Sequence, residues 1–211
     1  EINSLINSSY SDLDALLVYI LESAMRLVEC ESSSILLADK NGSVLYFKVA
    51  LGPAGLQAMN IPVETESSIA GWVFKHNESV LINDVQRDSR FSPVVQGHTG
   101  YKTENMVVVP MRVHNTCIGV IELLNKAGGK KFNQSDLGIL ELLSEQAGIA
   151  YQTAESFRNV QNENNLLQEN LSSGSEYHTF ITQSAVMKDL LKTLEEVAVT
   201  NTSVLLLGES G

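Results

Sequence analysis

Hydrophobic residues recur at helical spacing near the start of the chain. From Ser11 onward, apolar side chains stand every three or four positions, at Leu13, Leu16, Leu17, Ile20, Leu21, Ala24, Leu27 and Val28. Such spacing places them on one face of a helix. Ser11 and Asp14 resemble the pair of residues that caps a helix N-terminus. The pattern therefore predicts an amphipathic helix that begins at Ser11.

Segments rich in Val, Ile and Leu follow this helix and are typical of strands. They are residues 34–39, 43–50, 61–63, 80–83, 106–113 and 116–124. Lys40-Asn41-Gly42 joins the first two, and Asn-Gly favours a tight hairpin because it accepts the positive φ angles of the turn. The last two segments are the most apolar, with His114-Asn115 between them. We expect these two at the centre of an antiparallel sheet.

The segments between the strands carry different signals. Ser67 or Ser68 can cap a short helix over residues 69–75. Residues 84–103 contain Pro93, two glycines and several polar residues with no clear period, which predicts a long connection with at most a helical turn or two. Ordered connections of this length usually carry function.

A long helix is predicted after the last strand. Asn133 can cap it, and one face carries Leu137, Leu140, Leu143, Ala147 and Ala150. From residue 151 to residue 171 the apolar positions become sparse, which suits the narrow seam between two paired helices. We therefore expect this second half to be a connector that pairs two copies of the chain in a homodimer.

Residues 172–175, Ser-Ser-Gly-Ser, have the composition of a flexible linker. We assign residues 1–172 to one domain with its connector helix, and residues 173–211 to the linker and the beginning of a second domain. That second region shows a helical pattern from Val186 to Val197 and a buried-strand pattern over residues 203–207. Gly208-Glu209-Ser210-Gly211 follows, and a strand leading into Gly-x-x-Gly is how a phosphate-binding loop begins.

Composition limits the range of partners. The chain has 14 Lys and Arg against 25 Asp and Glu, which gives a net charge of −11. Non-specific nucleic-acid binding depends on clustered positive charge, so direct nucleic-acid contact is not expected. No apolar run approaches the roughly 20 residues that span a bilayer, and the N-terminus lacks the basic and apolar regions of a secretory signal. We expect a cytoplasmic location without membrane contact.

The sequence shows no pattern typical of a catalytic or metal site. Cys30 and Cys117 are far apart and form no Cys-x-x-Cys pair, and the four histidines are scattered. An enzyme would need a nucleophile beside its base, or two converging carboxylates. We therefore expect no metal, no required cofactor and no enzymatic activity in this chain.

Four blocks of sequence, in this order and at this spacing, resemble a GAF domain. They are residues 34–39, 69–73, 81–91 and 109–126, which read SILLAD, IAGWV, LINDVQRDSRF and VPMRVHNTCIGVIELLNK. The resemblance covers about residues 10 to 170. It implies an α+β fold in which the N- and C-terminal helices cover one face of a central antiparallel sheet. On the other face it implies a ligand pocket, roofed by residues 84–103.

GAF domains that bind cyclic nucleotides carry a further motif, which this chain matches at four of five positions. The matches are Asn125, Lys126, Phe132 and Asp136, and Leu137 stands in place of a glutamate. Lys126 can pair with Asp136 across the loop between the last strand and the long helix. We expect an exposed pair, worth about 0 to 1 kcal/mol. Nucleotide binding and purely structural pinning both explain such a motif.

The same resemblance implies a set of ligand-contacting residues: Ser34, Ile69, Ala70, Gln96, Thr99, Thr103 and Glu122. The Ser34 hydroxyl can meet a base edge. Ile69 and Ala70 begin a short helix, so their N–H groups have no partner within it and suit a phosphate. Thr99 and Thr103 are four residues apart, which on a helical turn places both hydroxyls on one side, within reach of a ribose or phosphate.

Glu122 and Gln96 complete this set. Glu122 lies at the edge of an otherwise apolar strand, where a buried acid needs a partner such as a ribose hydroxyl. Gln96 stands where related domains have an acid that helps to choose between purines, so the base preference stays open. Each residue also has a simpler explanation: Ser34 as a core hydroxyl, Thr99 and Thr103 as caps, and Glu122 as an outward-facing side chain.

About the last thirty-five residues resemble the entry to the AAA+ ATPase domain of bacterial enhancer-binding proteins, which activate RNA polymerase carrying the sigma-54 factor. The string VLLLGESG at residues 204–211 carries this resemblance. It implies a downstream AAA+ domain as a partner and, through it, sigma-54 RNA polymerase. The lysine and Ser/Thr of the phosphate loop are missing, so we do not expect ATPase activity in this segment.

Together these features predict a regulatory sensor. It would bind a small molecule, a cyclic nucleotide such as cGMP or cAMP in particular, and pass on its occupancy through the connector helix. Two alternatives remain open. One is a ligand-free scaffold that only dimerises, which a cavity filled by Trp72, Phe91 or Tyr101 would favour. The other is a sensor of a different metabolite such as 2-oxoglutarate.

Overall fold

The computed structural model describes residues 2–174, 182, 184–198, 205 and 208. Two compact units make up the chain, Glu1–Val160 and Gln161–Gly211, and each is described by itself. The predicted boundary at residue 172 stays a prediction. In the described part of the chain, no helix combines the length and the apolar character that crossing a membrane requires.

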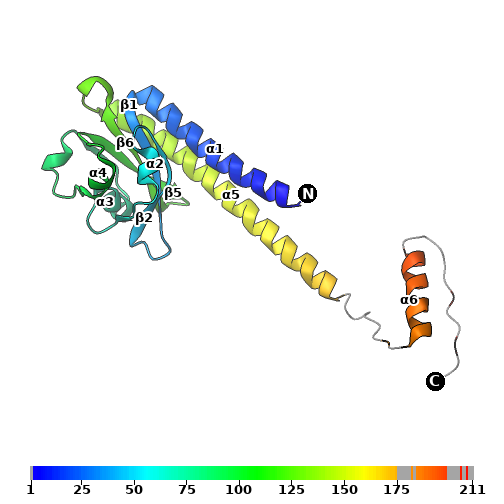
Figure 1. The fold of residues 1–211 in the computed structure, drawn as a ribbon. Helices are drawn as coiled ribbons and strands as arrows, with labels where there is room; N and C mark the ends of the chain where they lie inside the picture. Colours follow the sequence, from blue (N-terminus) through cyan, green and yellow to red (C-terminus); the bar gives the residue numbers. More distant parts are fainter. Residues whose placement is uncertain (1, 175–181, 183, 199–204, 206–207, 209–211) are drawn as a thin grey trace. The chain divides into compact units, whose positions relative to one another are not determined.

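The first unit is built on a six-stranded antiparallel sheet with the order β3-β2-β1-β6-β5-β4 (Figure 1). Its strands are β1 (Cys30–Ala38), β2 (Val44–Leu51), β3 (Val63–Glu64), β4 (Val80–Ile82), β5 (Met106–Val113) and β6 (Thr116–Lys126). The predicted α+β class and the antiparallel sheet are confirmed. The expected position of the last two strands is right for β6, which shares the centre with β1, whereas β5 lies one place further out.

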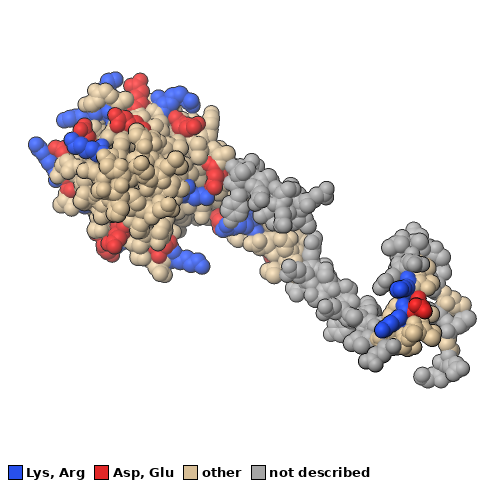
Figure 2. Space-filling model, in the orientation of Figure 1, with Lys and Arg blue, Asp and Glu red and all other residues tan. Residues whose placement is uncertain are grey.

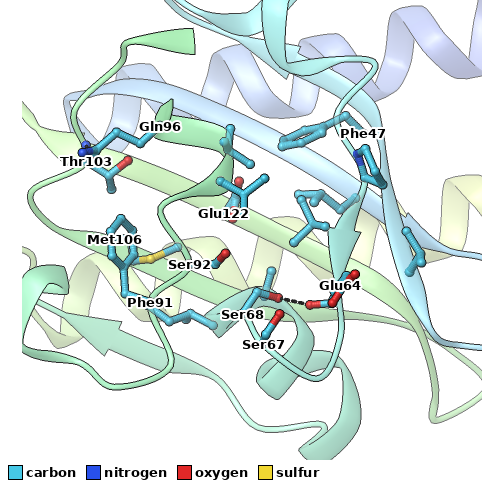
Figure 3. A pocket seen from close by; sticks show the side chains of 18 of the residues that line it. Phe47, Glu64, Ser67, Ser68, Phe91, Ser92, Gln96, Thr103, Met106 and Glu122 are labelled. Atoms are coloured by element: carbon cyan, nitrogen blue, oxygen red, sulfur yellow. Dashed lines mark hydrogen bonds between the residues drawn. The ribbon is translucent and has the colours of Figure 1, made fainter. Parts of the chain in front are cut away.

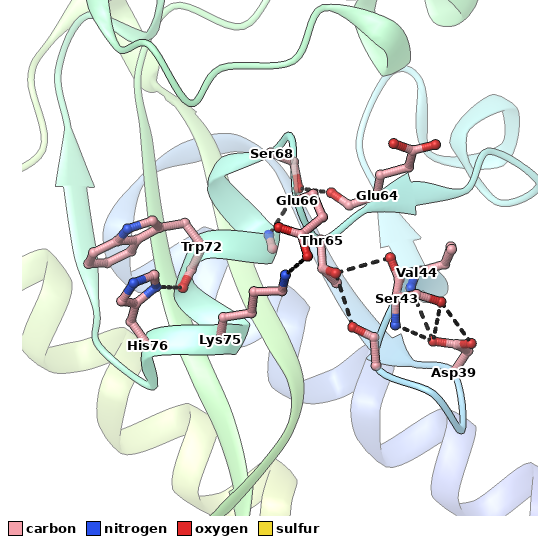
Figure 4. A network of polar contacts seen from close by, with 12 residues as sticks. Asp39, Ser43, Val44, Glu64, Thr65, Glu66, Ser68, Trp72, Lys75 and His76 are labelled. Carbon is pink, nitrogen blue, oxygen red and sulfur yellow. Dashed lines mark hydrogen bonds and ion pairs between the residues drawn. The ribbon is translucent and has the colours of Figure 1, made fainter.

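The predicted β1–β2 hairpin forms, although Gly42 and not Asn41 takes a positive φ in its turn. Gly42 adopts a φ of 67°, which is the left-handed region that glycine tolerates best. The Asp39 carboxylate closes the turn by accepting hydrogen bonds from the N–H groups of Val44 at 3.0 Å and Ser43 at 2.8 Å (Figure 4). These bonds, that from Val44 first, hold the pKa of Asp39 below its ordinary value.

Helices α1 (Ile2–Val28) and α5 (Gln134–Gly174) cover one face of the sheet (Figure 1). Their apolar sides and the alternate residues of the strands form one core, which includes Leu17, Leu21, Ile35, Ile121 and Leu140. Helix α1 begins at Ile2, so the start predicted at Ser11 is wrong. Residues 2–10 contain neither glycine nor proline, and nothing in them stops the helix from extending.

The N-terminus of α5 is capped as predicted. Asn133 accepts hydrogen bonds through Oδ1 from the N–H groups of Ser135 at 2.8 Å and Asp136 at 3.2 Å. Asp136 accepts one in return from the N–H of Asn133 at 2.9 Å. This reciprocal arrangement satisfies N–H groups that have no partner within the helix.

Short helices and a long connection cover the other face. They are α2 (Gly55–Ala58), α3 (Ile69–His76), the 3₁₀ turn η1 (Val85–Arg87) and α4 (Val94–Thr99). Ser68 caps α3 by accepting a hydrogen bond from the N–H of Gly71 at 3.0 Å. A second core lies beneath these elements and includes Leu36, Phe47, Val73 and Val120. Residues 84–103 thus form the expected connection with short helical turns.

The second unit contains helix α6 (Ala185–Ala198), which confirms the helical pattern from Val186 to Val197. The strand predicted over residues 203–207 lies outside the described residues, apart from Leu205. On the visible face of the described residues, acidic and basic side chains are interspersed without a continuous basic area (Figure 2).

Helix α5 approaches β5 closely at two points. The Ser144 hydroxyl donates a hydrogen bond to the carbonyl of Pro110 at 2.8 Å. One turn later, a Cβ atom on Gly148 would lie 2.1 Å from the carbonyl oxygen of Arg112. Because that neighbour is backbone and cannot rotate away, only glycine permits this contact.

We expect the Gly148→Ala variant to be destabilised by about 1–3 kcal/mol, since α5 must move away from β5 to admit a methyl group. Gly138→Ala in the same helix is the matched control, because a Cβ there meets nothing within 4 Å. That control should be more stable than the parent by about 0.5–1 kcal/mol. Urea denaturation of both variants measures the difference, and equal stability of the two would contradict the close contact.

Candidate ligand-binding site

A cavity of about 510 Å³ lies between the sheet and the elements that cover its second face (Figure 3). This volume falls within the roughly 300–1,000 Å³ typical of ligand pockets. Its apolar lining includes Leu36, Phe47, Phe91, Met106 and Leu124. A smaller cavity of about 50 Å³ lies beside it and shares several lining residues with it, among them Glu122. The face of the sheet on which the sequence predicts a ligand pocket therefore carries a cavity.

Glu122 and Ser34 form a buried polar pair on the sheet. They are direct partners across the β1–β6 ladder, and the Ser34 hydroxyl donates a hydrogen bond to Oε1 of Glu122 at 2.6 Å. Glu122 is only 7% exposed. Burial raises its pKa from 4.5 to about 7, although the Ser34 hydroxyl works in the opposite direction. The expected position at a strand edge is wrong, because β6 continues past Glu122 to Lys126 in the middle of the sheet.

The second carboxylate oxygen of Glu122 has no hydrogen-bond partner among the described residues. Among the described residues, some buried side-chain atoms have neither solvent contact nor a hydrogen-bond partner, and this oxygen is not one of them. Glu122 lines both cavities, so this oxygen is available to a bound molecule (Figure 3). The simpler explanation of Glu122 as an outward-facing side chain is wrong, whereas Ser34, which is 4% exposed, is a core hydroxyl that also bonds Glu122.

Ile69 and Ala70 begin helix α3 at the wall of the larger cavity. The first N–H groups of a helix have no partner within it. The cap at Ser68 takes the N–H of Gly71, and none of the described hydrogen bonds uses the N–H groups of Ile69 or Ala70. They are two free donors at the positive end of a helix dipole, which favours a negatively charged group.

The expected pairing of Thr99 and Thr103 on one helical turn is wrong. Helix α4 ends at Thr99, and Gly100 turns the chain away with a φ of 71°. The Thr99 hydroxyl donates a hydrogen bond to the carbonyl of Val95 at 2.8 Å and accepts one from the N–H of Tyr101 at 3.2 Å. It therefore acts as a cap and lines only the smaller cavity.

Thr103 and Gln96 lie closer to the ligand space. Both line the two cavities, and Thr103 is 8% exposed. The N–H of Thr103 donates a hydrogen bond to Oε1 of Gln96 at 3.2 Å, which fixes the glutamine side chain. The structure thus brings five of the seven predicted residues to the larger cavity, Ile69, Ala70, Gln96, Thr103 and Glu122, while Ser34 and Thr99 line the smaller one.

Comparison with known proteins adds to this geometry. A family model described as "GAF domain" matches residues 11–152. This chain belongs to the GAF domain family. Solved structures agree on the fold: a methyl-accepting chemotaxis protein, residues 122 to 287, has a TM-score of 0.62 and 23% identity over 74% of this chain and 98% of that one. GAF domains are small-molecule sensing and regulatory domains, and this chain is one of that class.

Curated relatives match over the same region at low identity. A dual 3',5'-cyclic-AMP and -GMP phosphodiesterase 11A from Takifugu rubripes is 31% identical over 69% of this chain and 17% of its own length. A probable 3',5'-cyclic phosphodiesterase from Caenorhabditis elegans is 26% identical over 70% and 21%. The formate hydrogenlyase transcriptional activator FhlA from Escherichia coli is 28% identical over 71% and 23%. The GAF chain therefore spans less than a quarter of the length of these relatives.

Several residues that line the GAF cavity are not among those predicted from the sequence. Phe47 and Met106 belong to the alternate positions of β2 and β5 that face the cavity, so strand alternation carries a signal for them once the two faces of the sheet are known. Glu64 on β3 lines the cavity and is exposed. Neither cavity is lined by Lys, Arg or His among the described residues, and Glu64 and Glu122 are the charged groups there.

The motif of Asn125, Lys126, Phe132 and Asp136 lies away from both cavities, since none of its members lines them. The Lys126 ammonium lies 2.6 Å from Oδ1 of Asp136, and the two side chains are only 10% and 7% exposed. The ammonium also lies 5.8 Å from the centre of the Phe132 ring. The expectation of an exposed ion pair is wrong, because the end of β6 and the start of α5 enclose both charges.

Asn125 fastens the connection that roofs the cavity. It adopts a φ of 57°. Its side chain accepts a hydrogen bond from the N–H of Glu104 at 2.8 Å and donates one to the carbonyl of Lys102 at 2.8 Å. A further bond joins its amide nitrogen to the Tyr101 hydroxyl at 3.0 Å. In this structure the motif pins the sheet to α5 and to the roof, which is the structural role considered above.

Removing Lys126 should test this role directly. We expect Lys126→Ala to lower the free energy of unfolding by about 3–5 kcal/mol, since it leaves the buried Asp136 carboxylate without its partner. The control is Lys75→Ala, which breaks an ion pair with Glu66 whose side chains are 33% and 83% exposed. That variant should lose about 0–1 kcal/mol. Equal losses in chemical denaturation would contradict a structural role for the motif.

The raised pKa of Glu122 has a measurable effect on stability. A carboxyl whose pKa rises from 4.5 to about 7 on folding stabilises the protein fully below pH 4.5. That contribution is lost as the pH rises towards 7, because the folded state must then carry a buried charge. The free energy of unfolding of Glu122→Gln, relative to that of the parent, should therefore be higher at pH 8 than at pH 5 by on the order of 2–3 kcal/mol.

Urea denaturation at the two pH values measures this gain. Glu64→Gln is the matched control, because this exposed lining acid should change the difference little. If the stability difference between Glu122→Gln and the parent is the same at pH 5 and pH 8, Glu122 is not buried as described.

Proposed function

We propose that this GAF domain binds a cyclic nucleotide, cGMP or cAMP, in the cavity between its sheet and the α3–α4 region. The observation that carries the proposal is the combination of free N–H donors at one wall with a buried carboxyl and hydroxyl pair on the sheet. The N–H groups of Ile69 and Ala70 suit a cyclic phosphate, which carries a single negative charge. Glu122 and Thr103 are placed to bond the ribose or the base.

Two further observations support a cyclic nucleotide. The relatives include two proteins named as cyclic nucleotide phosphodiesterases, which match this chain over the GAF region. The cavity is also lined by the large apolar side chains of Phe47, Phe91 and Met106, which suit the face of a purine.

The alternative functions receive less support. A ligand-free scaffold would be favoured by aromatic side chains that fill the cavity. Phe91 lines the larger cavity and Tyr101 the smaller one, but about 510 Å³ of the larger cavity stays open. Trp72 lines neither cavity and stacks on His76 with ring centroids 4.3 Å apart. A dicarboxylate such as 2-oxoglutarate would meet two acidic side chains and no Lys, Arg or His in the described lining of either cavity. Like charges in a buried site are costly.

The domain acts, in this proposal, as the sensor of a sigma-54-dependent transcriptional activator. FhlA, a transcriptional activator, is among the relatives, and the C-terminal sequence resembles the entry to an AAA+ domain. Ligand binding shifts the population between two arrangements of the roof and of α5, and α5 passes the difference to the ATPase. The GAF chain itself performs no catalysis and requires no cofactor for this role.

The sensor acts as a homodimer paired through α5. On its exposed side this helix carries four apolar residues that are each more than half exposed: Leu142, Ile149, Phe157 and Val160. These side chains recur at intervals of seven, eight and three residues, which resembles the seam of paired helices. A second copy of the chain would bury them.

Calorimetry with cGMP and cAMP tests the ligand assignment. We expect heat of binding with at least one nucleotide, and an affinity about five-fold lower in Thr103→Val, which removes one hydroxyl without changing the shape of the side chain. Thr116→Val is the control, because Thr116 is exposed and does not line either cavity. The absence of heat with both nucleotides at millimolar concentration would refute the assignment. Native mass spectrometry of the same sample reads the stoichiometry and any retained small molecule.

A further inference from the structure

Among the residues that the structure describes, Glu122 is the one with a titratable side chain that lines both cavities. One of its oxygens accepts the hydroxyl of Ser34, and the other has no partner among the described residues. Figure 3 shows the carboxyl in the middle of the cavity, between Phe47 and Met106. A ligand that fills this space meets Glu122 directly.

The hydrogen-bonding capacity of a carboxyl group depends on its proton. A carboxylate offers two acceptors, whereas a neutral carboxylic acid offers one donor and one acceptor. The two purines differ in the same way along the edge that normally pairs with another base. Guanine presents the O6 acceptor and, next to it, two adjacent donors, N1–H and the N2 amino group. Adenine presents the N6 donor beside the N1 acceptor and has no pair of adjacent donors.

We propose that the protonation of Glu122 sets the purine preference of this cavity: the carboxylate favours guanine, and the neutral acid is the form that pairs with adenine. This inference rests on the proposed function, since it concerns the base of a cyclic nucleotide. Ser34 keeps its bond to Oε1 in both states, because that oxygen can accept a second donor.

The surroundings of Glu122 make it the responsive group. The other titratable side chains that line the two cavities are Tyr46 on β2, Glu64 on β3 and Tyr101 on the roof. Tyr46 and Glu64 are exposed, and burial raises the pKa of Tyr101 to about 12, so its hydroxyl stays neutral near pH 7. On the neighbouring strands, Ser34 and Val108 face Glu122 and carry no charge. Burial brings the pKa of Glu122 itself to about 7.

Calorimetric titration of the full chain at pH 6 and pH 8 tests the inference. With a pKa near 7, the ionised fraction rises from about one tenth to about nine tenths between these values, so the affinity for cGMP should rise by up to about ten-fold. The affinity for cAMP should fall by a similar factor. At pH 7, repeating the titrations in buffers of different ionisation enthalpy should show proton release with cGMP and proton uptake with cAMP.

Two variants separate this role from a merely structural one. In Glu122→Gln the side-chain amide offers one donor and one acceptor at every pH, so its cGMP-to-cAMP affinity ratio should be the same at pH 6 and pH 8. Glu145→Gln replaces an exposed acidic residue of α5 that lines neither cavity, and it should keep the pH-dependent preference of the parent. Near-ultraviolet circular dichroism establishes that both variants are folded.

The outcomes distinguish this inference from the proposed function. Binding of either nucleotide with a cGMP-to-cAMP affinity ratio that does not change with pH overturns the proton-controlled preference and leaves the nucleotide site intact. A Glu122→Gln variant that keeps the pH-dependent ratio of the parent has the same consequence. The absence of binding by both nucleotides at both pH values overturns the proposed function and this inference together.

Discussion

The buried carboxyl of Glu122 is the constraint on which the site depends. A charged group in the middle of a sheet is unfavourable unless it is paired, and in the described part of the chain only the Ser34 hydroxyl bonds it. An apolar residue at this position would complete the core beside Val108 and Val120. The fold instead keeps an acid with a free oxygen and a hollow in front of it. A ligand that bonds this oxygen relieves an unfavourable feature of the empty domain.

The rigid frame around this cavity comes from polar contacts at one end of the sheet. Lys126 and Asp136 join β6 to α5 within a shielded environment, and Asn125 holds the end of the roof through its side-chain amide. These residues do not touch the ligand space. The motif of Asn125, Lys126, Phe132 and Asp136 thus holds the frame of the pocket together without lining it.

Local signals in the sequence were sufficient for most of the fold. The Asn41-Gly42 hairpin, the Ser68 cap and the Asn133 cap each depend on neighbouring residues, and each forms as predicted. Errors arose where distant parts of the chain decide the outcome. The burial of Lys126 and Asp136 depends on where α5 docks, and the separation of Thr99 from Thr103 depends on a left-handed turn at Gly100. The hollow itself is a tertiary property, since no single segment encodes an unfilled volume.

The contact between α5 and β5 at Gly148 has a mechanical consequence. At most packing contacts, rotatable side chains separate two backbones and can absorb a small displacement by changing rotamer. Here main chain rests on main chain, at the carbonyl of Arg112. A shift of β5 by a fraction of an ångström therefore displaces the axis of the helix itself, and the absence of a side chain at one residue makes this point a stiff joint between the binding layer and the long helix.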